Sequence, residues 1–181
     1  MLALYIVAGL AILVLLVKVA EAFGRVYRKY RGDRVITCPE NRRPAGVRVD
    51  VRHALLDPRG PDAGVRLKTC SRWPERQDCG QPCLSQIEAA PEDCLVRNIL
   101  TRWYEGKHCA LCGKPIGEIQ WASHRPALMD PQHKTVQWWE VRPENVPDVL
   151  ATHQAVCWNC HIVNKMVNEH PDLVLDRSRQ S

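Results

Sequence analysis

The chain has 181 residues, enough for a membrane segment and one to two small domains. It contains 1 Phe but 13 Pro and 9 Cys, a composition typical of small domains whose thin apolar core needs metal ions or disulfides. The net charge of +5 is modest and lies largely beside an apolar segment, so it does not indicate nucleic acid as a partner.

An uncharged N-terminal run predicts a membrane anchor. Residues 2–17 carry no charge, and the apolar run resumes after Lys18. About 20 apolar residues cross a bilayer as a helix, and a terminal lysine extends its amine to the interface. We therefore predict a transmembrane helix at residues 1–23. A cleaved signal peptide is the alternative, because residues 20–22 are similar to a cleavage site, although no basic residue precedes the run.

Basic residues after the anchor predict its orientation. They extend through a juxtamembrane segment at residues 24–33 and are Lys18, Arg25, Arg28, Lys29, Arg31 and Arg34. Because cytoplasmic flanks are enriched in Lys and Arg, this side is expected in the cytoplasm. We predict a single-pass protein of the plasma or inner membrane, with the N-terminus outside and the C-terminal domain cytoplasmic.

Residues 34–94 predict a small antiparallel β unit. Short segments at 35–38, 47–51 and 65–70 are rich in β-formers or alternate apolar and polar side chains, as half-buried strands do. Residues 57–64 are rich in Pro and Gly and predict a loop. A three-stranded sheet of these segments places Cys38 and Cys70 at strand ends.

The β unit carries a second group of cysteines, at irregular spacing: Cys38, Cys70, Cys79 and Cys83. These four thiols are a candidate second metal site, with zinc favoured over an iron–sulfur cluster. Free buried thiols and disulfides are the alternatives, the latter disfavoured by a cytoplasmic location. Cys94 opens a helix predicted from residues 91–103, and we expect it to pack rather than ligate.

The strongest motif is a pair of Cys-x-x-Cys sequences, Cys109/Cys112 and Cys157/Cys160. Four thiolates in two such pairs are the ligand set of a closed tetrahedral zinc site. Residues 118–121 and 134–141 predict strands, residues 145–151 a short helix, and the segment from Cys157 a longer one. We therefore predict an α+β fold in which residues 95–170 form a helix and a treble-clef-like zinc lobe, followed by a frayed tail at 171–181.

The same lobe has a resemblance to a nuclease family. The sequences Cys109-x-x-Cys-Gly, 123–126, 144–146 and Cys-x-x-Cys-His161 resemble the HNH endonucleases with their zinc-bound treble clef, over about residues 109–165. The resemblance implies His124 as general base and His161 as a holder of the catalytic metal. The chain departs from the family pattern because no acidic residue precedes His124 and Asn145 lies far from the last cysteine pair.

The segment from Cys157 to His161 also matches Cys-x-x-Cys-His, the attachment motif of c-type haem. A membrane-anchored haem or iron–sulfur redox protein is therefore the first alternative function, and an HNH-like nuclease is the second. The predicted cytoplasmic orientation favours zinc, because covalent haem attachment is expected on the other side of the membrane.

We predict a zinc-binding accessory or adaptor subunit that docks to a membrane protein complex. The sequence favours a binding protein over an enzyme, and no catalytic or further cofactor-binding residue is assigned. Large aromatic side chains are abundant in the zinc lobe, and any exposed one would suit a protein contact. These are Trp121, Trp138, Trp139 and Trp158.

Overall fold

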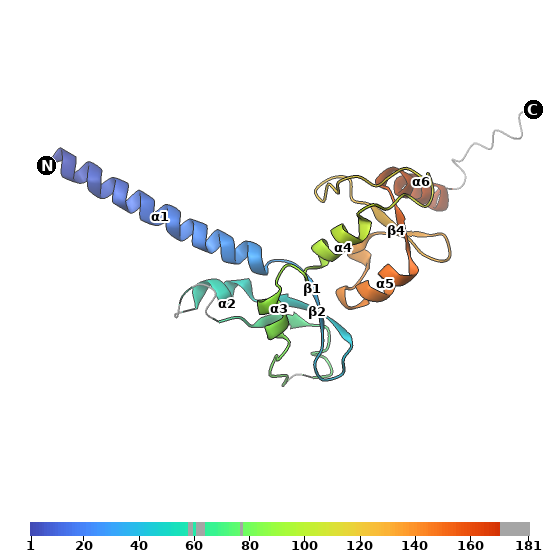
Figure 1. The fold of residues 1–181 in the computed structure, drawn as a ribbon, viewed down its shortest axis with the longest axis horizontal. Helices are drawn as coiled ribbons and strands as arrows, with labels where there is room; N and C mark the ends of the chain where they lie inside the picture. Colours follow the sequence, from blue (N-terminus) through green and yellow to red (C-terminus); the bar gives the residue numbers. More distant parts are fainter. Residues whose placement is uncertain (58–59, 61–63, 77, 171–181) are drawn as a thin grey trace, which may run out of the picture. The chain divides into compact units, whose positions relative to one another are not determined.

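The computed structural model describes residues 1–57, 60, 64–76 and 78–170 (Figure 1). The tail predicted at 171–181 lies outside the described residues, as does part of the loop predicted at 57–64. The chain divides into two compact units, Met1–Val96 and a second that begins at Arg97. Helices and two small antiparallel sheets make the fold α+β, as predicted.

The first unit begins with the long helix α1, Leu2–Tyr30, the one helix among the described residues that is long and apolar enough to cross a membrane. Its C-terminus is held by Arg34, whose side chain is fully buried. Arg34 Nη1 donates to the carbonyl oxygen of Tyr30 at 2.7 Å, and its Nη2 donates to that of Lys29. These bonds satisfy carbonyls that have no partner within the helix.

A three-stranded antiparallel sheet follows, in the order β1-β2-β3, which confirms the predicted arrangement. The strands are β1 Arg34–Thr37, β2 Pro44–Val49 and β3 Leu67–Cys70. Cys38 directly follows β1 and Cys70 ends β3. The sheet packs its apolar side chains, among them Ile36 and Val47, with Ile87 of a later helix to form the core of this unit.

The helices of the first unit differ from the sequence prediction. Strand β2 ends at Val49 because Asp50 caps α2, Val51–Leu56, accepting a hydrogen bond from the His53 backbone N–H at 3.1 Å. The short helix α3, Leu84–Ala89, was not predicted. The helix predicted from residue 91 begins only at Val96, because Leu95 forms a bridge with Arg34 at the sheet edge.

The second unit is a small sheet surrounded by helices (Figure 1). Its strands run antiparallel in the order β5-β4-β6. The elements are α4 Val96–Tyr104, β4 Ala127–Met129, β5 Thr135–Val136, η1 Trp138–Glu140, η2 Pro143–Asn145, α5 Val146–Thr152, β6 Gln154–Val156 and α6 Trp158–Glu169.

One strand prediction in this unit is wrong, and a second predicted strand is too long. Residues 118–121 form no strand, and the segment predicted at 134–141 is reduced to Thr135–Val136 before η1 begins. A capping box between Gln137 and Glu140 ends the extended backbone there. Strands β4 and β6 were not predicted, because each has only three residues and neither alternates buried with exposed side chains: all three are buried in β4, and in β6 an exposed residue precedes two buried ones.

Tyr104 connects α4 to the rest of the second unit. Its hydroxyl donates to the carbonyl oxygen of Ala127 at 2.6 Å and accepts from Nε1 of Trp138 at 3.1 Å. The rings of Trp103, Tyr104 and Trp138 meet edge to face, at centroid distances from 4.9 to 6.4 Å. This aromatic cluster is joined through the Tyr104 hydroxyl to β4, the central strand of the sheet, whose neighbour β6 ends directly before Cys157.

Candidate metal centre

The two Cys-x-x-Cys pairs meet in the second unit. The sulfur atoms of Cys109, Cys112, Cys157 and Cys160 all lie within 4.8 Å of one another. The Sγ atoms of Cys112 and Cys157, from different pairs, are 3.9 Å apart. Sulfurs at the corners of a tetrahedron with metal–sulfur bonds of about 2.3 Å are separated by about 3.8 Å. The four cysteines are therefore placed to bind a metal ion.

The first pair lies in a tight turn. The backbone N–H of Gly113 donates to the carbonyl oxygen of Cys109 at 2.9 Å, and that of Cys109 donates to Lys114 O at 2.9 Å. Gly113 has φ +69°, which favours glycine because it has no Cβ. The Ala110 N–H also donates to Ala155 O at 2.8 Å, which ties the turn to β6.

The second pair lies at the junction between β6 and α6. Cys157 occupies the N-cap position of the helix, without a side-chain capping hydrogen bond, and Cys160 lies in the first turn. Because β6 pairs with β4 and also receives the hydrogen bond from Ala110, the sheet brings the helix start against the turn that carries Cys109. The two sulfurs of each pair are close because their cysteines are only three residues apart in the chain. The meeting of the two pairs depends on this sheet.

Backbone donors surround the most buried thiol. Burial acts to raise the pKa of Cys109, but hydrogen bonds from the backbone N–H groups of Cys157, Cys112 and Leu111 outweigh it and lower the pKa to about 6. Burial and the adjacent sulfurs raise the pKa of Cys157 and Cys160. One thiolate is thus favoured, whereas a full set of four needs a cation to neutralise it.

The two histidines of the nuclease resemblance have different surroundings. His161 is buried, with Nδ1 2.8 Å from Thr135 Oγ1 and Nε2 2.5 Å from Nε2 of Gln137. Burial, followed by the nearby charge of Lys165, lowers the pKa of His161. His124 is exposed, with its ring edge to face against Trp158. Thr135 and Gln137 were missed in the sequence, because no local pattern connects them to His161.

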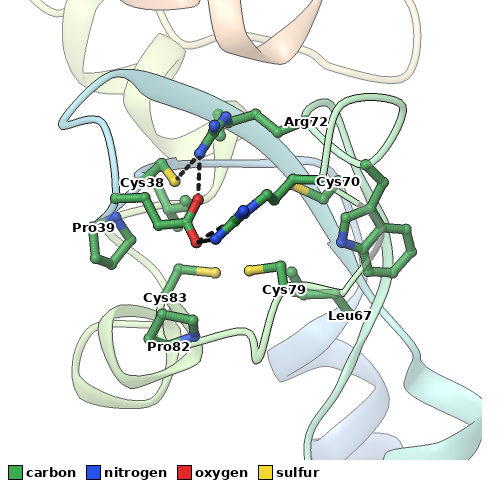
Figure 2. Close-up of a pocket in the computed structure, with 13 residues that line it drawn as sticks. Cys38, Pro39, Leu67, Cys70, Arg72, Cys79, Pro82 and Cys83 are labelled. Carbon is green, nitrogen blue, oxygen red and sulfur yellow. Dashed lines mark hydrogen bonds and ion pairs between the residues drawn. The ribbon is translucent and has the colours of Figure 1, made fainter.

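The second group of cysteines lines a small cavity in the first unit. Cys38, Cys70, Cys79 and Cys83 all border this space of about 20 Å³ (Figure 2). Among the described residues, the C-terminal cysteines are the group whose ligand atoms all lie within 4.8 Å of one another. The four sulfur atoms of the second group are therefore farther apart. Burial and the thiols of Cys70 and Cys79 raise the pKa of Cys83 to about 11. Metal binding at this group stays a prediction.

The remaining cysteine lies apart from both groups. The Sγ atom of Cys94 donates to the carbonyl oxygen of Pro91 at 3.4 Å, and the side chain packs against the core of the first unit. Burial raises the pKa of this thiol. A packed, hydrogen-bonded thiol agrees with the role expected for Cys94.

Several apolar side chains of the second unit are exposed. Trp139 in η1 is 62% exposed, and the guanidinium of Arg125 lies 5.8 Å from its ring centroid. On α6, Val163 and Met166 are 61% and 55% exposed, and Val167 is also exposed. Of the four tryptophans singled out in the sequence, Trp139 is the exposed one.

Comparison with known proteins does not extend these observations. The sequence matches no protein-family model, and neither a curated protein nor a solved structure is found that matches it. The fold and the site define a class only: an α+β chain with one apolar N-terminal helix and a cluster of four cysteines suited to metal.

Proposed function

We propose that this chain is a single-pass membrane protein whose second unit is a zinc-stabilised module for protein binding. The observation that carries the proposal is the approach of the sulfurs of Cys109, Cys112, Cys157 and Cys160 to within 4.8 Å of one another. Four thiolates with tetrahedral spacing are the donor set of structural zinc. Such a site has no open position for a substrate, so its role is to hold the fold.

The packing around the cysteines supports a structural role for the ion. The buried cluster beside them consists of Cys109, Met129 and Val156, with Ile116 and two more of the cysteines packed against it. So small a cluster contributes little burial free energy around the cysteines, and metal binding supplies stability of this kind in small domains. A cysteine-bearing turn, a short sheet and a helix that begins with the second pair give the treble-clef-like arrangement that we propose.

The N-terminal helix supports attachment to a membrane. Its large apolar side chains are exposed from Tyr5 to Val19, with Leu10 and Leu15 at 57% and 63%. Exposed apolar surface of this length is costly in water but favourable in lipid. The basic residues Arg25, Arg28, Lys29 and Arg31 then place the following units on the cytoplasmic side under the positive-inside rule. A cleaved signal sequence would share the length and composition, but it would be missing from the mature protein.

The adaptor role rests on the exposed apolar side chains of the zinc module. Four large apolar side chains of this unit are exposed to solvent: Trp139, and Val163, Met166 and Val167 of α6. Exposed aromatic and methionine side chains are common anchors in protein interfaces. We propose that they contact another protein of the same membrane, on its cytoplasmic face.

The haem and nuclease alternatives are less well supported. Both ring nitrogens of His161 lie within hydrogen-bond distance of Thr135 and Gln137, whereas an axial haem ligand or a catalytic metal ligand needs a free nitrogen. Cys157 and Cys160 also have the first pair as neighbours, which haem attachment would leave without a role. An iron–sulfur cluster shares the thiolate donor set and is distinguished from zinc by its colour.

Metal analysis and an absorption spectrum of the full chain in detergent test the metal assignment. We expect zinc, no Soret band and no broad charge-transfer absorption. The Cys109→Ser variant should hold about one zinc fewer per chain than Cys94→Ser, since serine is a poor zinc ligand. A Soret band, iron with labile sulfide, or equal zinc in the two variants would contradict the proposal.

Site-specific photocrosslinking in intact membranes tests the adaptor role. A photoreactive residue at Met166 or Trp139 should give a discrete crosslink to another membrane protein. The same residue at Lys114, which is also exposed, serves as the control. Crosslinking from the first two positions no greater than from Lys114 would count against this surface as a contact.

A further inference from the structure

The turn that carries Cys38 in the first unit has the same backbone hydrogen bonds as the turn that carries Cys109. In each, the cysteine carbonyl accepts from the N–H four residues ahead, at 2.8 Å from Arg42 and 2.9 Å from Gly113. The cysteine N–H donates to the carbonyl five residues ahead, at 2.9 Å in both turns.

The resemblance between the turns extends to a residue of positive φ and to a hydrogen bond received by the cysteine sulfur. Arg42 has φ 56° at the position where Gly113 has φ +69°. Such a conformation is uncommon for a residue with a Cβ and occurs where surrounding structure requires it. Each cysteine sulfur also accepts a hydrogen bond, that of Cys38 from Arg72 Nη1 at 2.9 Å and that of Cys109 from the Cys157 backbone N–H at 3.3 Å.

Three more thiols face the space beside this turn. Cys70 comes from the end of β3, and Cys79 and Cys83 come from the segment before α3. Figure 2 shows the thiols of Cys79 and Cys83 pointing toward each other across the cavity. We propose that this cavity is a second zinc site, formed by Cys38, Cys70, Cys79 and Cys83 and independent of the zinc module.

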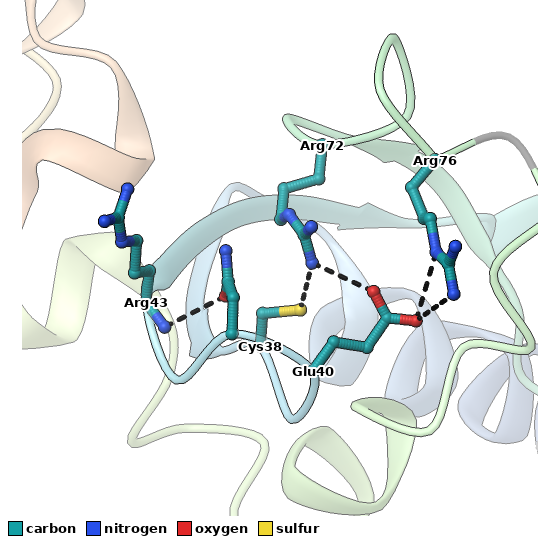
Figure 3. A network of polar contacts seen from close by, with 6 residues as sticks. Cys38, Glu40, Arg43, Arg72 and Arg76 are labelled. Carbon is teal, nitrogen blue, oxygen red and sulfur yellow. Dashed lines mark hydrogen bonds and ion pairs between the residues drawn. The ribbon is translucent and has the colours of Figure 1, made fainter.

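The charged side chains around Cys38 suit a thiolate ligand. Arg72 Nη1 donates to Cys38 Sγ at 2.9 Å and to a Glu40 carboxylate oxygen at 3.2 Å, and Arg76 donates to the same carboxylate at 3.1 Å (Figure 3). Four thiolates around Zn²⁺ have a net charge of −2, which the Arg72 guanidinium partly offsets. Hydrogen bonds of this kind to a ligand hold it in place and raise metal affinity.

Binding releases the thiol protons to solvent and draws the sulfurs together. Because the thiols come from three separate segments, the ion would join β1, β3 and the start of α3. Such a cross-link should slow amide exchange in the segments that carry Cys79 and Cys83.

Zinc content of the full-length protein in detergent tests the site. We expect about two ions per chain in the natural protein and in Cys94→Ser, and about one in Cys83→Ser or Cys79→Ser. Cys94 is the matched control, because it is also partly buried in the first unit but does not line the cavity. Zinc in Cys83→Ser equal to that in Cys94→Ser overturns the proposal.

The outcomes separate the two sites. If the natural protein and Cys83→Ser both hold about one ion and Cys109→Ser holds none, the second site is absent and the zinc module stands. If Cys83→Ser holds none and Cys109→Ser keeps one, only the second site binds zinc. Iron in place of zinc, or a disulfide between Cys79 and Cys83 in the protein isolated without reductant, would also overturn the proposal.

Two measurements do not depend on the folding of cysteine variants. Removing zinc from the natural protein with a chelator should speed amide exchange in peptides covering residues 79–89, and unchanged exchange there contradicts the proposal. Replacing Arg72 with Met should keep the ion but weaken its retention against a competing chelator by about 10–100-fold. Retention equal to that of the natural protein would exclude a role for Arg72.

Discussion

The backbone N–H of Cys157 donates a hydrogen bond to Sγ of Cys109 over 3.3 Å. This contact joins the start of α6 to the turn that holds the first cysteine pair. It places a donor on a thiol that is only 2% exposed, and so favours the thiolate form that a metal ion requires. The two halves of the candidate metal centre are therefore held together by the protein backbone as well as by any ion.

Replacing Cys109 with Ser should unfold the second unit in the zinc-bound protein. Structural zinc contributes about 10–16 kcal/mol in small domains, more than the total stability of most of them. Hydrogen exchange of the amides in β4 and β6 should become more than about 100-fold faster, since their protection depends on the folded unit. Cys94→Ser should leave that protection unchanged. Protection in Cys109→Ser equal to the natural protein would argue against a structural ion.

Replacing Tyr104 with Phe should lower the free energy of unfolding of the second unit by about 1–3 kcal/mol. The change removes the hydroxyl and with it two hydrogen bonds, one to the Ala127 carbonyl and one from the Trp138 indole N–H. Denaturant titration followed by tryptophan fluorescence measures the effect. Tyr27→Phe is the control, because that ring is 49% exposed. Equal midpoints for the two variants would show that the Tyr104 hydroxyl contributes little.

Replacing Asp50 with Ala should destabilise α2 by about 1 kcal/mol, and Asp50→Asn by less, because Asn keeps the capping acceptor. Such a loss corresponds to about fivefold faster amide exchange in residues 51–56. The experiment compares exchange in the natural protein and both variants at neutral pH. Identical rates in Ala and Asn variants would contradict the capping role.

The contribution of Asp50 should also depend on pH. A hydrogen bond from Arg66, at 2.8 Å, and one from the His53 N–H lower the pKa of Asp50. Because the folded pKa lies below the unfolded value of about 3.9, the stabilisation is complete above that value and is lost as the pH falls through the folded pKa. The difference in free energy of unfolding between the natural protein and Asp50→Asn should therefore become smaller as the pH falls. A difference that becomes larger on acidification would contradict a lowered pKa of Asp50.

Neutralising the juxtamembrane charges should disturb the orientation of the protein. Changing Arg25, Arg28, Lys29 and Arg31 to Gln removes the signal that holds this flank in the cytoplasm. Protease added outside intact cells should then cleave a fraction of the chains, whereas the natural protein should stay protected and sediment with membranes. Gln at Arg102, Lys107 and Lys114 is the control. A natural protein that is released without residues 1–23 would indicate a signal sequence instead.

Short strands limited what the sequence predicted of the fold. The first sheet was predicted because its strands carry β-forming and alternating residues, as in β2. Strand β4 is three buried residues, and β5 is two residues. Segments so short have no intrinsic preference strong enough to define them, and they are extended because neighbouring strands supply hydrogen-bond partners. The same dependence on distant partners explains why the role of His161 beside Gln137 was missed.

The apolar helix and the candidate metal-binding cysteines can be read from the sequence, because an uncharged run and the Cys-x-x-Cys spacing are local properties of the chain. The meeting of the two pairs within 4.8 Å cannot be read in this way, since their distance depends on the β5-β4-β6 sheet. Tertiary structure also showed that Cys38 lies in a turn like that of Cys109. Asn41 stands where the second cysteine of a pair would be, so the likeness is one of backbone hydrogen bonds and dihedral angles, which the sequence motif does not record.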